Sequence, residues 1–66
     1  MSDAMIQIVD SYVKLQDRSA LEKLQAHRRK LLDALQSLAG PFDAAKPIKQ
    51  NEDELLIIEA GIARLG

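Results

Sequence analysis

The chain has 66 residues, one histidine, no cysteine and a formal net charge of −1 at pH 7. A chain of this length forms one small domain at most, and such domains are commonly stabilised by disulfides, metals or self-association. Disulfides are excluded here, and a four-ligand zinc site lacks its ligands. We therefore expect no metal and no cofactor. Because its positive and negative charges nearly cancel, the chain has no general attraction to nucleic acid or lipid.

Hydrophobic residues make up 47% of the chain, but Tyr12 and Phe42 are its only aromatic residues. The apolar volume therefore comes mostly from aliphatic side chains, and abundant Leu and Ala favour helices over strands. We predict an all-α fold in a single helical domain over residues 1–66. The expected architecture is a small antiparallel helical hairpin or three-helix bundle, completed by self-association.

Two helical stripes of apolar residues run through the first 39 residues, one over 5–15 and one over 21–38. On one continuous helix their centres would lie roughly 110° apart, at 3.6 residues per turn. This offset favours a break near 17–19. The predicted helices are then about 3–17 and 19–39.

The local residues at this break leave two interpretations open. Ser19 and Glu22 have the spacing of a capping box that would start the second helix. However, residues 16–20 contain neither Gly nor Pro, so one helix over 3–39 is the alternative. We favour the break.

The strongest interruption of the chain is Gly40-Pro41. Glycine readily closes a helix, and proline cannot continue one. Pro47 restricts the residue before it and argues against a helix that starts much earlier. We therefore predict a loop over 40–50.

Asn51 has the character of a helix N-cap, and Glu54 stands three residues later, as in a capping box. The following residues repeat apolar side chains at helical spacing. The third helix is therefore predicted over about 51–65. Its apolar stripe consists of Leu55, Ile58, Ile62 and Leu65.

The first helix carries more apolar surface than a helix of a small monomer needs. Its side chains cover about half of the helix circumference, and a short third helix cannot hide all of them. We expect this face to bind a partner, either a second copy, with a dimer favoured, or another helical protein. The predicted partner-binding residues are Met5, Ile8, Val9, Tyr12 and Leu15.

The sequence lacks the residues that a catalytic site requires. The single histidine, His27, has no acid or second histidine three or four residues away, and no serine stands in a nucleophile-elbow pattern. The three glycines are isolated and form no phosphate-binding loop. We expect no enzyme activity and no small-molecule substrate. Gly61, near the apolar stripe, is predicted to allow close approach of a neighbouring helix.

A short basic strip is the basis of an alternative function. Positive residues spaced along a helix can follow nucleic acid phosphates, although acids flank these ones and solvated charge runs are common. The alternative is a dimeric nucleic-acid-binding regulator, with nucleic acid as its partner. The strip consists of Lys23, His27, Arg29 and Lys30.

Arg28 falls inside the apolar arc of the second helix. An arginine there is expected to meet an acid such as Glu54 or Glu59, or an acid of a second chain. A polar residue in an apolar seam can set helix register and oligomeric state. We predict this register-setting role for Arg28.

The N-terminus lacks the basic residues of a secretory signal, and no apolar run approaches the length of a membrane span. A cytoplasmic location without a membrane partner is therefore expected. The function we predict is a non-catalytic protein–protein interaction module, such as a small adaptor, regulator or assembly factor, that presents an apolar helical face.

Overall fold

The computed structural model describes residues 3–38 and 45–65. These residues form three helices and no strand: α1 spans Asp3–Lys14, α2 spans Arg18–Leu38 and α3 spans Ala45–Arg64. The predicted all-α fold is confirmed. The predicted stop at Gly40-Pro41 lies outside the described residues.

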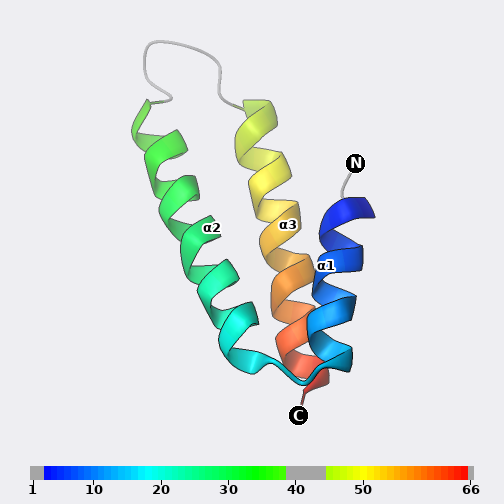
Figure 1. Ribbon diagram of the computed structural model, residues 1–66. Helices are drawn as coiled ribbons and strands as arrows, with labels where there is room; N and C mark the ends of the chain where they lie inside the picture. Colours follow the sequence, from blue (N-terminus) through cyan, green and yellow to red (C-terminus); the bar gives the residue numbers. More distant parts are fainter. Residues whose placement is uncertain (1–2, 39–44, 66) are drawn as a thin grey trace.

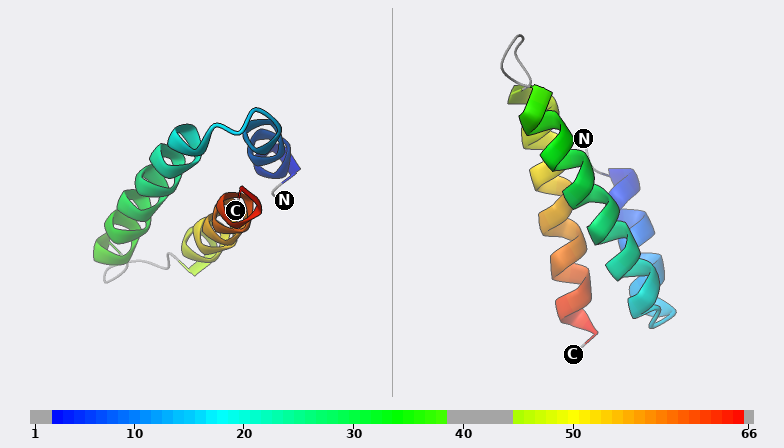
Figure 2. Two further views of the ribbon diagram at one scale, coloured as in Figure 1. Left: turned by 90° about the horizontal axis from the view of Figure 1, so that it is seen from below. Right: turned by 90° about the vertical axis from the view of Figure 1, so that its left-hand side faces the viewer.

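The helices alternate in direction. α2 runs antiparallel to both α1 and α3, while α1 lies beside α3 and parallel to it (Figures 1 and 2). α1 packs mainly against α3 and makes fewer contacts with α2. The molecule is elongated, with extents of 42 × 21 × 14 Å.

The core lies where all three helices meet. Leu21 of α2 and Ile58 of α3 are fully buried, and Met5 and Val9 of α1 pack with them. Side chains of this size each contribute about 1.5–3 kcal/mol on burial. Around this centre pack partly buried neighbours, namely Tyr12, Val13, Leu24, Ile57, Ile62 and Leu65.

Gly61 is the point of closest approach between α1 and α3. A Cβ atom at position 61 would overlap Cγ1 of Val9 and lie 3.5 Å from Cγ2 of Val13. The absent side chain therefore lets the two helices pack closely. The predicted close approach at this glycine is confirmed.

The predicted break between the first two helices is confirmed, but α1 ends three residues earlier than expected. Gln16 has a φ of 56°. Its N–H donates to the Val13 carbonyl at 3.0 Å, and the Asp17 N–H donates to the Tyr12 carbonyl at 2.9 Å. This pair of bonds is a Schellman motif, with a glutamine in the position where glycine is usual.

Asp17 caps α2, so the predicted capping box of Ser19 and Glu22 is wrong. The Ala20 N–H donates to Asp17 Oδ1 at 3.1 Å, and the Leu21 N–H donates to the Asp17 carbonyl at 3.3 Å. Because Asp17 both completes the end of α1 and starts α2, the chain reverses within three residues.

The predicted loop is wrong over residues 45–50, and the predicted N-cap at Asn51 is wrong too, because α3 begins at Ala45. Pro47 is the third residue of the helix. The first four N–H groups of a helix have no partner within it, so the missing N–H of proline removes no hydrogen bond there. Asn51 instead lies inside α3 and is 3% exposed.

α1 is much shorter than the hairpin it packs against. It has 12 residues, whereas α2 has 21 and α3 has 20. At 1.5 Å per residue, α1 is about 12 Å shorter than α3. α1 lies beside the C-terminal half of α3 and leaves the N-terminal half without a third helix (Figure 1). None of the three helices combines the length and the apolar character needed to cross a bilayer.

Candidate protein-interaction face

The side of α3 that contacts α1 continues beyond the end of α1. Gly61 contacts Val9, and Glu54, Gln50 and Pro47 lie seven, eleven and fourteen residues before Gly61. Residues at these spacings share one side of a helix. The N-terminal half of this side borders two hollows, which we call together the open face.

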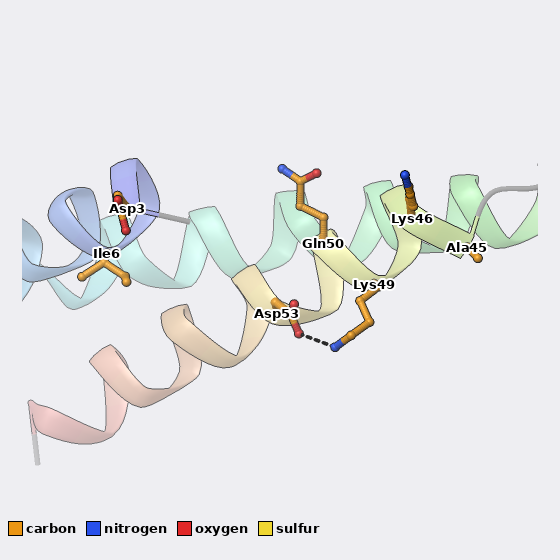
Figure 3. A pocket seen from close by; sticks show the side chains of 7 residues that line it. All are labelled: Asp3, Ile6, Ala45, Lys46, Lys49, Gln50 and Asp53. Atoms are coloured by element: carbon orange, nitrogen blue, oxygen red, sulfur yellow. Dashed lines mark hydrogen bonds and ion pairs between the residues drawn. The ribbon is translucent and has the colours of Figure 1, made fainter. Parts of the chain in front are cut away.

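The larger hollow, of about 710 Å³, lies between the start of α1 and the first half of α3. Figure 3 shows Asp3 and Ile6 at one end of it, Gln50 in the middle and Lys46 at the other end. Seven residues line it: Asp3, Ile6, Ala45, Lys46, Lys49, Gln50 and Asp53.

The second hollow, of about 220 Å³, lies between α2 and α3. Gln50 lines both hollows, so they adjoin at this residue. The walls of the second hollow combine apolar and polar side chains. They consist of Arg28, Leu31, Leu35, Pro47, Gln50, Asn51 and Glu54.

Apolar side chains are exposed along the open face. Ile6 is 51% exposed and Leu31 is 37% exposed. Leu31 lies on the side of α2 that packs against the core one heptad earlier, at Leu24. Ile6 is a residue of α1 and lies where α1 borders the larger hollow.

The charges of the open face balance. Three acids, Asp3, Asp53 and Glu54, stand against three bases, Arg28, Lys46 and Lys49. Two ion pairs use four of these groups: Lys49 with Asp53 at 3.1 Å and Arg28 with Glu54 at 3.2 Å. Asp3 and Lys46 have no ion-pair partner among the described residues. The face is thus neutral as a whole, with one acid and one base left over.

Arg28 pairs across the hairpin with Glu54, one of the partners expected for it. The two side chains are only 25% and 14% exposed. A charge pair shielded to this extent depends on both members, because either one alone would be left poorly solvated. The pair joins the middle of α2 to the middle of α3.

Asn51 joins the same two helices through the backbone. Its Nδ2 donates to the Arg28 carbonyl at 2.8 Å. Asn51 Oδ1 and Arg28 Nε are shielded from solvent and have no hydrogen-bond partner among residues 3–38 and 45–65. Two residues that line the second hollow therefore each carry one unsatisfied polar atom, which is costly when the atom is buried.

Glu59 forms a second link across the hairpin, away from the open face. Its Oε2 accepts from Gln25 Nε2 at 3.2 Å and from Arg29 Nη2 at 2.7 Å. The sequence alone did not predict that Gln25 and Arg29 contact Glu59. Helical spacing places Gln25 and Arg29 on one face, but the partner follows only from how α3 lies on α2.

Asp10 links α1 to the end of α3. It lies 3.2 Å from Lys14 Nζ and 3.1 Å from Arg64 Nη2. The hydrogen bond from Lys14, and then the one from Arg64, hold the pKa of the Asp10 carboxyl below its ordinary value of 3.8.

The residues predicted to bind a partner through the first helix fall into two groups. Met5 and Val9 are 4% and 3% exposed, because they pack into the core of this chain. Ile8 and Leu15 are 44% and 73% exposed, and Tyr12 is partly buried. The exposed pair borders neither of the two hollows, and isolated exposed apolar side chains are ordinary. The open face was missed because it depends on where α1 stops.

The predicted basic strip lies on exposed positions of α2. Lys23, His27 and Lys30 are exposed. Arg29 is 60% exposed and is paired with Glu59. Its charge is therefore partly neutralised within the chain, which weakens the nucleic-acid alternative.

Among the described residues, no group of three or more histidine or acidic side chains is arranged to hold a metal ion. No protein-family model matches the chain, and neither a curated protein nor a solved structure matches it.

Proposed function

We propose that this chain is a non-catalytic protein-interaction module whose open face receives a helical partner. One observation carries the proposal: α1 fills only half of the third-helix position on the α2–α3 hairpin. The other half has exposed apolar walls and balanced charge, which suits a protein partner more than a nucleic acid backbone or an anionic lipid surface.

The chemistry of α1 indicates what kind of partner fits. α1 holds its half of the position with apolar residues at helical spacing, Met5, Val9 and Val13, and with one acid, Asp10, that meets a base of α3. A helix with an apolar stripe would bind the other half in the same way.

Site-specific photo-crosslinking in the native host tests this function. A photoreactive amino acid replaces Leu31 on the open face in one variant. In the matched control it replaces Leu56, a leucine of α3 that is 64% exposed and lines neither hollow. We expect a covalent protein adduct from position 31 and none from position 56. No adduct from position 31, or equal adducts from both, would overturn the proposal.

A further inference from the structure

We propose that the open face binds the open face of a second copy of this chain, with the two α3 helices antiparallel. This inference rests on the proposed function and names its partner. Three features support it: the charge of the face, the position of Gln50 within it and the accessible surface of the chain.

The charge of the face is complementary to itself. Asp3 and Lys46 are the two charged lining residues that pair with no other residue in the described part of the chain, and they lie at opposite ends of the larger hollow (Figure 3). Consider a two-fold axis in the plane of the contact, perpendicular to α3 and level with Gln50. It brings Asp3 of each copy opposite Lys46 of the other, so the contact forms twice.

The same axis lies close to Gln50 in both copies. Gln50 lies at the junction of the two hollows, close to this axis, and its side chain is exposed. Residues close to a two-fold axis meet their own neighbours in the other copy. A carboxamide both donates and accepts, so the two Gln50 side chains can pair with each other across the axis.

The exposed area suits a weak dimer. The accessible surface of the chain is 4653 Å², whereas a compact monomer of 7.3 kDa exposes about 4200 Å². The chain therefore exposes about 450 Å² more than a compact monomer, which is comparable to what each partner buries in a weak, transient interface. We therefore expect a dissociation constant in the micromolar range.

Sedimentation equilibrium of the purified chain, from about 1 μM to about 1 mM, measures this dimer. In a dimer of Leu31→Glu, each copy brings one carboxylate into the contact. This change is expected to weaken the dimer by about a hundredfold or more. Leu56→Glu, the matched change outside the open face, is expected to leave the dissociation constant unchanged. Helicity measured by circular dichroism on each variant confirms that it folds.

A charge exchange tests the antiparallel arrangement. Asp3→Lys alone opposes two lysines at each contact, and Lys46→Asp alone opposes two aspartates, so each variant is expected to weaken its own dimer by about tenfold. When the two variants are mixed in equal amounts, each contact again joins opposite charges. The mixture should recover the affinity of the unmodified chain.

The outcomes separate the two proposals. A chain that stays monomeric up to about 1 mM, or a dimer that Leu31→Glu leaves intact, overturns the second copy as partner. A mixture that fails to recover affinity overturns the antiparallel contact. If position 31 still crosslinks to a different protein, the proposed function stands while this inference fails.

Discussion

At the scale of single residues, two positions show how closely α1 is held against the hairpin. Gly61 provides space for Val9, and Asp10 accepts from Arg64 near the end of α3. The first contact is steric and is tested by changing the size of a side chain. The second is electrostatic and is tested by changing the pH.

Gly61→Ala is expected to destabilise the chain. The added methyl group gains about 1 kcal/mol of helix propensity, but overpacking against the buried Val9 costs about 1–3 kcal/mol. We expect a net loss of about 1 kcal/mol in the free energy of unfolding, measured with urea. In a double variant with Val9→Ala, the new methyl group partly fills the space left by valine, so the double loss should be less than the sum of the single losses. Additive losses would contradict this packing.

The lowered pKa of Asp10 makes the contact between α1 and α3 sensitive to acid. Its pKa in the folded chain lies below the ordinary 3.8, so its stabilisation is present above that value and is lost as the pH falls through the folded pKa. Between about pH 4 and pH 2, the melting temperature should fall more steeply for the natural chain than for Asp10→Asn. Parallel pH profiles would show that this carboxylate contributes nothing to folding.

At the scale of elements, the sequence predicted three helices and the break between the first two, but placed several boundaries wrongly. The C-terminus of α1 was missed because its left-handed residue is Gln16 rather than glycine. The start of α3 was missed because Pro47 is tolerated within the first turn of a helix. The Arg28–Glu54 pair was anticipated from an arginine inside an apolar arc. The open face was not, since it follows from the difference in helix length.

Gln16→Gly is expected to stabilise the turn between α1 and α2. A non-glycine residue with φ of 56° is strained by about 1 kcal/mol, and glycine relieves that strain at some cost in unfolded-state entropy. A gain of about 0.5 kcal/mol in urea unfolding is expected. Glycine in place of Gln7, within α1 and exposed, should instead destabilise by about 1 kcal/mol. A loss at position 16 as large as at position 7 would rule out the left-handed turn.

The Arg28–Glu54 pair provides a test of how α2 is joined to α3. Arg28→Leu leaves the Glu54 carboxylate, 14% exposed, without its partner, and we expect a loss of about 2 kcal/mol. Arg28→Leu combined with Glu54→Leu removes both charges and should restore at least the original stability. A double variant as unstable as the single one would contradict the account of the pair. The effect of both variants on oligomeric state tests the register-setting role.

At the scale of the whole molecule, a bundle that is complete at one end and open at the other explains the small core and the large exposed surface together. The described core lies where α1 covers the hairpin. Beyond it, the exposed walls of the open face remain available for a partner. We propose that the covered half stabilises the chain and that the open half binds the partner.

Intermolecular paramagnetic relaxation tests this account most directly. The chain has no cysteine, so Ala45→Cys carries a single nitroxide label at the start of α3, and labelled chains are mixed with ¹⁵N-labelled unmodified chains. The antiparallel dimer predicts broadening of the amide signals of Asp3–Ile6 in the unmodified chains, with the signals around Lys23 unaffected. Absence of broadening at these residues, or broadening centred on Lys23, would contradict it.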